Sequence, residues 1–301
     1  MTPLFALLAV ALCAETHVYK RAGQLEIKAD VYRTQGSGMH PVLIWIHGGA
    51  LIMGSRRNLE EGRKKHLDRY LAEGWNVVSI DYRLAPETKL PRIWEDVRDA
   101  HAWIRRDGPK LFGADPNRIG IVGGSAGGYL TLLAAAKLQP KPKVAISYYG
   151  YGDITGDWYA KPDAFYRRQP EVSKDEAWAS VGKQEVAEPP SPNQRGRFYL
   201  FTRQQGLWPQ LVGGGRDLDA YCPEKLAGRD FPPTMLLHGD ADTDVPVEQS
   251  KQMAAVLQRL GVPHELVILP GAPHGFDRAA DQPTVREAFE KAIAFLKQYL
   301  R

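Results

Sequence analysis

The sequence contains only two cysteines among its 301 residues, Cys13 and Cys222. Cys13 follows an apolar run at the amino end, and if this run is removed from the mature chain, Cys222 is left as a single thiol. An intrachain disulfide is then excluded. The cellular compartment therefore cannot be inferred from cysteine pairing.

The sequence also lacks a strong charge of one sign. Its 39 Lys and Arg residues are nearly balanced by 35 Asp and Glu residues, which leaves a formal net charge of +4. The basic residues are dispersed among acidic ones, and a cluster such as Arg63–Lys65 is typical of a solvated helix face. Without a continuous basic stripe, the composition gives no support for nucleic-acid binding.

Long apolar runs are absent as well. The run Leu4–Leu12 is too short to cross a bilayer, so no transmembrane segment is expected. Together with a cleavage site after Ala14 it resembles a secretory signal, which predicts a signal peptide over residues 1–14 and a secreted or periplasmic protein. The amino end, Met1–Pro3, lacks the usual Lys or Arg, and a short buried strand or a frayed terminus is the alternative. The bulky residue before Cys13 argues against a lipoprotein site.

Signatures of phosphate, dinucleotide and metal binding are also missing. The glycine-rich segment around Ser125 has neither the spacing of a dinucleotide fingerprint nor the Gly-Lys-Ser/Thr ending of a phosphate loop. Alternating aspartates from Asp240 to Asp244 invite a calcium loop, but the positions that require Gly and Glu hold Val245 and Lys251. The sequence therefore implies no cofactor and no metal.

What the sequence does contain is a regular alternation of strand and helix patterns, with no internal repeat and no low-complexity tract. Such alternation predicts one α/β domain over residues 15–301, with a mostly parallel sheet wrapped by helices. The segment Val18–Arg33 is expected to supply antiparallel edge strands. Strands are expected from residue 42 and at 76–80, 119–122, 144–148, 234–237 and 265–269, and helices at 59–73, 93–106, 129–137, 248–260 and 284–300.

The segment Ile121–Gly128 (IVGGSAGG) places Ser125 on a turn between a buried strand and a helix of small residues. Gly123 and Gly127 have no side chains, so the strand and the helix can approach closely on either side of the serine. A serine held in strained backbone geometry with an exposed hydroxyl is a nucleophile elbow. A plain strand-to-helix turn is the alternative.

A serine that attacks a carbonyl needs hydrogen-bond donors for the oxygen that becomes negative. The strand expected from residue 42 leads into His47, Gly48 and Gly49. The backbone N–H groups of the two glycines can turn inward because no side chain obstructs them. The N–H of Ala126, just after Ser125, would supply a further donor. These three residues are the expected oxyanion hole, and His47 is expected to brace the loop by hydrogen bonds and not to transfer protons.

These motifs resemble the α/β-hydrolase superfamily, and more narrowly esterases of the hormone-sensitive-lipase type and their relatives among carbohydrate esterases such as acetyl xylan and feruloyl esterases. The resemblance rests on HGGA (47–50), DYRLAPE (81–87) and GGSAG (123–127), with Ala50 where the family usually has a third glycine. It covers residues 42–136 strongly and 231–299 well. It implies the α/β-hydrolase fold, and it implies that DYRLAPE braces the loop beside the oxyanion hole.

A serine nucleophile needs a base to take its proton and an acid that orients the base. In this fold the chain order is Ser, acid, His, which leaves His238, His264 and His274 as candidate bases. His274 lies in a Gly/Pro-rich loop after an apolar strand, whereas His264 opens that strand and His238 precedes the acid loop. His274 is therefore the expected base.

The acid is expected in the loop GDADTDVP, residues 239–246. In the family that the chain resembles, the acid falls three residues after the glycine and three residues before Val-Pro, which selects Asp242. Asp240 is the second candidate. Asp240 and Asp244 are otherwise expected to cap the loop or to be solvated.

About eighty residues separate the strand that ends near Tyr149 from the strand that begins near Thr234, much more than a usual loop. We expect a cap or lid over residues 150–230, inserted before the acid-bearing strand. The segment is rich in aromatic residues interleaved with arginines. These aromatics are expected mainly to form the core of the cap, and lining an acyl pocket or stacking on a sugar is the alternative.

The sequence thus predicts a serine ester hydrolase that forms an acyl-enzyme through Ser125, His274 and Asp242. The cap lacks long aliphatic stretches, which favours short acyl esters, and the resemblance favours a sugar or another small polar alcohol as the second half of the substrate. A formamidase or a small serine peptidase on the same triad is an alternative, although a peptidase usually brings a large additional domain. A non-catalytic binding module of this fold would be expected to lack the Ser or the His. The oligomeric state is not indicated.

Overall fold

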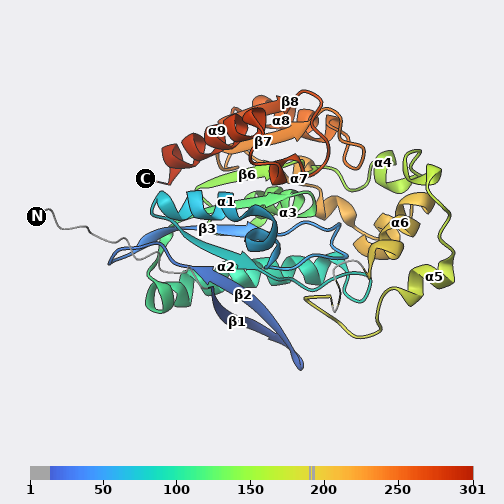
Figure 1. The fold of residues 1–301 in the computed structure, drawn as a ribbon, viewed down its shortest axis with the longest axis horizontal. Helices are drawn as coiled ribbons and strands as arrows, with labels where there is room; N and C mark the ends of the chain where they lie inside the picture. Colours follow the sequence, from blue (N-terminus) through green and yellow to red (C-terminus); the bar gives the residue numbers. More distant parts are fainter. Residues whose placement is uncertain (1–13, 190, 192–193, 301) are drawn as a thin grey trace, which may run out of the picture.

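A central sheet of eight strands organises the molecule (Figure 1), in a computed structural model that describes residues 14–189, 191 and 194–300. The strands lie in the order β1-β2-β4-β3-β5-β6-β7-β8. Their bounds are β1 Glu15–Ala22, β2 Leu25–Tyr32, β3 His40–Ile46, β4 Asn76–Ile80, β5 Ala114–Gly124, β6 Val144–Tyr148, β7 Thr234–Gly239 and β8 His264–Leu269. Residues 1–13, which carry nearly all of the expected signal peptide, lie outside the described residues.

The sheet is parallel from β3 to β8, and β2 is antiparallel to both of its neighbours, β1 and β4. The prediction of a mostly parallel sheet with an antiparallel pair at its edge is therefore confirmed. Because parallel strands end at the same edge of a sheet, the loops that follow β3, β5, β7 and β8 meet there. These are the loops that contain the expected site residues.

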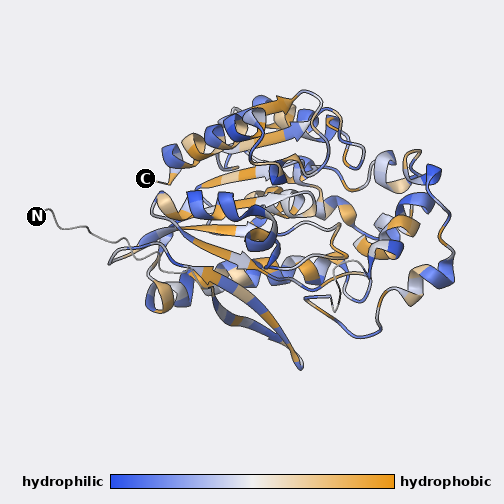
Figure 2. Cartoon of the chain, in the orientation of Figure 1, coloured by the Kyte–Doolittle hydropathy of each residue, from blue (hydrophilic) through white to orange (hydrophobic). Residues whose placement is uncertain are grey.

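Long helices cover both faces of the sheet. Helices α1 (Asn58–Ala72) and α9 (Pro283–Tyr299) pack on one face, and α2 (Leu90–Phe112), α3 (Ala126–Lys137) and α8 (Glu248–Leu260) pack on the other. A hydrophobic core lies on each face of the sheet, and side chains of β3 alternate between the two cores, as the two-residue period of a strand requires. Figure 2 shows that the central strands consist largely of apolar residues. Helices on both faces bury the sheet and leave its edge of loops accessible.

Helix α2 and strand β5 are considerably longer than the sequence pattern predicts. Helix α2 runs past the expected end at residue 106 and includes Pro109. It ends at Phe112 and is capped by Gly113, whose φ of 65° is left-handed. The N–H of Gly113 donates to the carbonyl of Gly108, so the last turn is closed despite the proline. Strand β5 begins at Ala114, directly after this cap, so the predicted loop between helix and strand is absent.

The described residues between β6 and β7 form short helical elements, among them α4 (Asp157–Ala160), α5 (Lys174–Ala179), α6 (Gly196–Gln205) and α7 (Pro223–Leu226). In Figure 1, α4, α5 and α6 lie beyond one end of the sheet. We call residues 150–230 the cap segment below. Among the described residues, no helix combines the length and apolarity needed to span a membrane.

Candidate active site

Ser125 lies at the sharp turn between β5 and α3 with φ 57° and ψ −125°, a conformation that L residues rarely adopt. The turn depends on close backbone contacts that only glycine permits. A Cβ on Gly127 would lie 2.0 Å from the carbonyl oxygen of Ile46, and a Cβ on Gly123 would lie 2.4 Å from the carbonyl oxygen of Gly127. The two glycines flanking the serine therefore fix the strained geometry that exposes its hydroxyl.

The structure brings the three residues of the expected triad into one chain of hydrogen bonds. Nε2 of His274 lies 3.0 Å from Oγ of Ser125, and Nδ1 of His274 lies 2.7 Å from Oδ2 of Asp242. The other carboxylate oxygen of Asp242 accepts the backbone N–H groups of Asp244 and Val245 at 2.8 and 2.9 Å. The carboxylate is thus fixed by its own loop and aimed at the imidazole.

The electrostatics of this chain keep Asp242 charged. Burial opposes ionisation, but hydrogen bonds from His238 and His274 hold the pKa of the Asp242 carboxyl well below its usual range. Burial also lowers the pKa of His274, yet the hydrogen bond to Asp242 and the negative charge of Asp244 outweigh it, and the net pKa is raised. Asp242 is therefore an acceptor for His274 over the whole physiological pH range.

His238 is a partner of the acid that the sequence reasoning missed. It is fully buried in β7, and its Nε2 lies 3.0 Å from the carbonyl oxygen of Val245 and 3.3 Å from Oδ2 of Asp242. Because a carbonyl only accepts, Nε2 carries the proton and Nδ1 can accept from the hydroxyl of Ser250, 2.7 Å away. His238 therefore positions the acid loop. Its place just before that loop was the available sequence signal.

The three expected oxyanion donors surround Ser125. In the described part of the chain, the backbone N–H groups of Gly48 and Gly49 donate to no other group. Ala126 is the first residue of α3, so its N–H has no acceptor within the helix. Gly48 packs so closely that a Cβ would lie 3.2 Å from Cβ of Ser125. Unoccupied N–H groups beside a serine are what a developing oxyanion needs.

The loop that carries these glycines is braced by the DYRLAPE segment. The hydroxyl of Tyr82 donates to the carbonyl of His47 at 2.9 Å, and the two rings stack with centroids 4.2 Å apart. The N–H of Ala85 donates to the carbonyl of Leu51 at 2.7 Å. Burial lowers the pKa of His47 to about 4, so His47 is neutral at physiological pH. Its contacts with Tyr82 agree with the expected role of bracing the loop.

The cap segment holds the same loop from the other side. Arg195 donates to the carbonyl oxygens of Ile52 and Ala85, both at 2.6 Å, and pairs with Glu87. Trp208 donates its ring N–H to the carbonyl of Ala50 at 3.0 Å. These bonds join residues more than 100 positions apart in the chain, which is why no local pattern indicated them.

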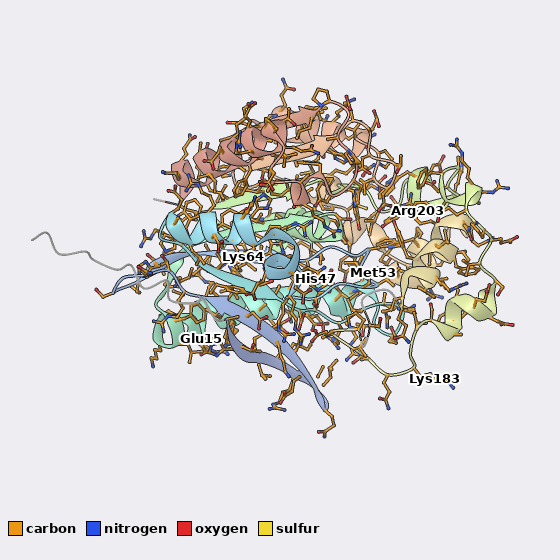
Figure 3. All side chains as sticks on the ribbon, in the orientation of Figure 1. Glu15, His47, Met53, Lys64, Lys183 and Arg203 are labelled. Atoms are coloured by element: carbon orange, nitrogen blue, oxygen red, sulfur yellow. The ribbon has the colours of Figure 1, made fainter. Side chains whose placement is uncertain are left out.

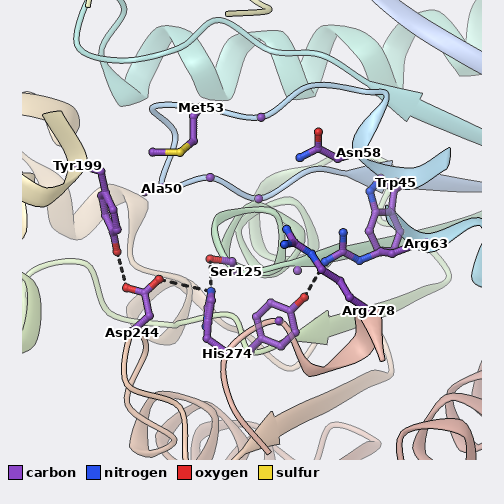
Figure 4. Close-up of a pocket in the computed structure, with 16 residues that line it drawn as sticks. Trp45, Ala50, Met53, Asn58, Arg63, Ser125, Tyr199, Asp244, His274 and Arg278 are labelled. Atoms are coloured by element: carbon purple, nitrogen blue, oxygen red, sulfur yellow. Dashed lines mark hydrogen bonds and ion pairs between the residues drawn. The ribbon is translucent and has the colours of Figure 1, made fainter. Parts of the chain in front are cut away.

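The aromatic residues of the cap segment mostly form its own core, as the first of the two interpretations expects. Trp158, Tyr159 and Trp208 stack in a row with centroid separations of 3.9 and 4.3 Å. Tyr199 is the exception that faces the site (Figure 4). In Figure 3, the labelled residues His47, Met53 and Arg203 follow one another from the end of the sheet to the cap segment.

Asp244 differs from the expectation of a loop-capping or solvated residue. Its carboxylate pairs with the buried Arg203 of α6 at 2.7 Å and accepts the hydroxyl of Tyr199. Its second oxygen lies 3.5 Å from Nε2 of His274, the atom that also faces Ser125. Asp244 is held in this position because Arg203, a cation from the distant cap segment, lies beside it. Asp240 does behave as a capping residue, since it is exposed and accepts the N–H of Gly271.

Ser125, His274 and Asp244 line a pocket of about 470 Å³ (Figure 4). Tyr199, Asp244 and Met53 lie on one side of Ser125, and Trp45, Asn58, Arg63 and Arg278 lie on the opposite side. The lining residues are Trp45, Gly48, Gly49, Ala50, Met53, Gly54, Asn58, Arg63, Gly124, Ser125, Tyr149, Tyr199, Asp244, His274, Gly275 and Arg278. Within the described residues, no group of three or more His, Cys, Asp or Glu is placed to hold a metal ion.

A parallel sheet wrapped by helices, with a glycine-flanked serine turn after its fifth strand, defines the α/β-hydrolase class. The sequence model of the alpha/beta hydrolase fold family Abhydrolase_3 matches residues 43–278, and the chain belongs to this family. Among solved structures, an alpha/beta hydrolase superfamily protein from Enterococcus faecalis superposes with a TM-score of 0.75 and 24% identity, over 96% of this chain and 100% of that one.

Similar sequences occur in enzymes of different size. The chain is 32% identical to esterase LipC of Mycobacterium tuberculosis, over 79% of this chain and 53% of LipC. It is 27% identical to the non-reducing polyketide synthase adrD of Penicillium rubens, over 95% of this chain and 14% of the synthase. The chain therefore spans only a part of the length of these curated relatives.

Proposed function

We propose that the protein is a serine carboxylic-ester hydrolase. The observation that carries the proposal is the hydrogen-bonded chain Ser125, His274 and Asp242 beside unoccupied backbone donors, with separations of 3.0 and 2.7 Å. Membership of the α/β-hydrolase family and the similarity to esterase LipC support the ester-hydrolase class. A serine, a base, an acid and backbone donors in this arrangement are the groups that acyl transfer to a serine uses, which supports the proposal.

The geometry supports a two-step reaction through an acyl-enzyme. As Oγ of Ser125 attacks the ester carbonyl, Nε2 of His274 takes its proton, and the imidazolium that forms is stabilised by Asp242. The N–H groups of Gly48, Gly49 and Ala126 donate to the oxyanion. His274 then protonates the departing alcohol. In the second step His274 takes a proton from water, which attacks the acyl group. His274 then returns this proton to Oγ of Ser125 as the acid is released.

The pocket favours a short acyl group and a polar alcohol. Much of its lining is polar or charged, including Asn58, Arg63, Asp244 and Arg278. Its volume of about 470 Å³ is shared between both halves of the substrate. A fatty acyl chain would need a long apolar surface that this lining does not offer. The proposal is therefore an esterase for acetyl to butyryl esters, with an acylated sugar as one candidate substrate.

This predicts how activity depends on chain length. Each methylene accommodated in an apolar pocket contributes roughly 0.8 kcal/mol, so a lipid-directed enzyme would gain specificity steadily with acyl length. Here we expect kcat/KM for 4-nitrophenyl esters to peak between acetate and butyrate, because longer chains exceed the pocket. Acetate release from acetylated xylo-oligosaccharides is measured in parallel. A maximum at octanoate or beyond, without release from the sugar esters, would contradict the proposed substrate.

Export is proposed on the amino-terminal sequence alone. If residues 1–14 are a signal peptide, the protein recovered from a secreting host should begin near Glu15, as intact mass spectrometry can determine. Cleavage at this point would leave β1 complete, since it begins at Glu15. Recovery of the chain with Met1 still present, in the cytosolic fraction only, is the result that would rule export out.

A further inference from the structure

One wall of the pocket, formed by Arg63, Arg278 and Asn58, presents hydrogen-bond donors that the proposed triad does not use. Arg63 was expected on a solvated helix face, but it is buried at a break in the regular backbone of α1. It pairs with Asp277 through Nε and donates from Nη2 to the hydroxyl of Tyr149 at 2.9 Å. Its charge is therefore balanced by Asp277, and its position is fixed by two partners.

Arg278, the next residue after Asp277, lines the same wall but has no such partner. Its side chain is exposed to solvent, and in the described part of the chain no carboxylate oxygen lies within 4 Å of its guanidinium and it makes no side-chain hydrogen bond. Arg203, which lies toward the opposite side, differs from Arg278 because it pairs with both Asp163 and Asp244. Figure 4 shows Arg278 beside Arg63, on the side of Ser125 that is remote from Asp244.

Asn58 adds a neutral donor to this wall. It is the first residue of α1, and its side-chain amide makes no hydrogen bond to another described residue. The wall thus combines a fixed guanidinium, an amide and a guanidinium without a counter-ion, while the negative Asp244 lies across the pocket. A planar guanidinium can donate two parallel hydrogen bonds to one carboxylate, and such charge-assisted bonds are among the strongest in proteins.

We propose that this wall binds a carboxylate of the substrate, so that the preferred substrates are short esters that also carry a carboxylate group. This inference rests on the proposed ester-hydrolase function and narrows its substrate class. Arg278 supplies the charge, Arg63 supplies further donors from a position fixed by Asp277 and Tyr149, and Asn58 supplies a neutral amide donor. Asp244 repels an anion from the other side and so sets the orientation of the ester over Ser125.

The carboxylate can belong to the acyl half or to the alcohol half of the ester, and matched substrate pairs separate the two. For the acyl half, 4-nitrophenyl hemisuccinate is compared with 4-nitrophenyl butyrate. For the alcohol half, an acetylated glucuronic acid is compared with the same acetate of glucose. We expect kcat/KM to favour the charged member of at least one pair, and the advantage to shrink as salt is added.

The variant Arg278→Gln then removes the positive charge that is proposed to bind the substrate carboxylate. The ratio of kcat/KM for charged over neutral ester should fall by about 10- to 100-fold, as expected for a lost charge-assisted hydrogen bond. Arg286→Gln, an exposed arginine on α9, is the matched control and should leave the ratio unchanged. A ratio that favours the neutral ester in both pairs, or that does not respond to Arg278→Gln, overturns the inference and leaves the ester-hydrolase proposal standing.

A binding measurement makes the result independent of turnover. In Ser125→Ala, the affinity for the preferred charged ester is measured by calorimetry and compared with that for its neutral partner. Tighter binding of the charged ester that is lost in Ser125→Ala/Arg278→Gln supports the carboxylate site. Equal binding of both esters overturns it. Failure of the unsubstituted protein to hydrolyse any ester in either pair refutes the proposed function and, with it, this inference.

Discussion

Replacing Ser125 with alanine is expected to abolish ester hydrolysis while leaving the fold intact. Loss of the nucleophile in a serine hydrolase lowers turnover by on the order of 10⁶-fold in the subtilisin precedent. Ser125 is only partly buried, and alanine keeps its Cβ in the same strained turn, so no cavity opens in the core. The measurement is kcat for 4-nitrophenyl acetate together with thermal unfolding of the same preparation.

Covalent labelling identifies the nucleophile independently of rate. An organophosphonate should add a single label to the unsubstituted protein, mapped by mass spectrometry to the peptide that contains Ser125, and none to Ser125→Ala. Ser37→Ala is the matched control, because Ser37 is exposed in the loop before β3, at the amino end of that strand. Labelling of another serine, or full activity in Ser125→Ala, would show that the elbow is not the reacting site.

The parts of the site that were predictable from sequence are those written in short contiguous strings. Strand β5, the glycine-flanked Ser125 and the start of α3 occupy one uninterrupted segment, and close backbone approach dictates its glycines. Gly48 and Gly49 follow directly on the end of β3, in another short contiguous string. In a parallel sheet these strand ends share one edge, so their proximity follows from topology alone.

The parts that escaped prediction depend on partners far apart in the chain. Arg195 reaches the carbonyl of Ile52 across 143 positions, and the pair of Arg203 with Asp244 spans 41. Periodicity reports which face of an element is buried and not which distant residue it meets. Asp244 looked like a solvated loop residue for this reason. His238 was visible as a strand-end histidine, but its contact with Asp242 depends on how the loop folds back.

The choice among the three aspartates of the acid loop leads to the second large effect. Asp242→Asn is expected to lower kcat on the order of 10⁴-fold, as amide replacement of a triad carboxylate does in a serine protease. The amide oxygen can still accept the N–H groups of Asp244 and Val245. Its NH₂ group then faces Nδ1 of His274 and the N–H of His238, so His274 is forced to accept at Nδ1 and to carry its proton on Nε2. A protonated Nε2 cannot take the proton of Ser125.

The neighbouring aspartates are the controls, and each has its own expected result. Asp240→Asn should keep kcat within about threefold, because an exposed amide oxygen can still accept the N–H of Gly271. Asp244→Asn removes a negative charge 3.5 Å from Nε2 of His274 that helps to raise its pKa. The pKa of His274 should therefore fall. Because the base must be neutral to act, the acidic limb of the kcat/KM profile should move to lower pH. Collapse of activity in Asp240→Asn, with most activity retained in Asp242→Asn, would instead assign the acid to Asp240.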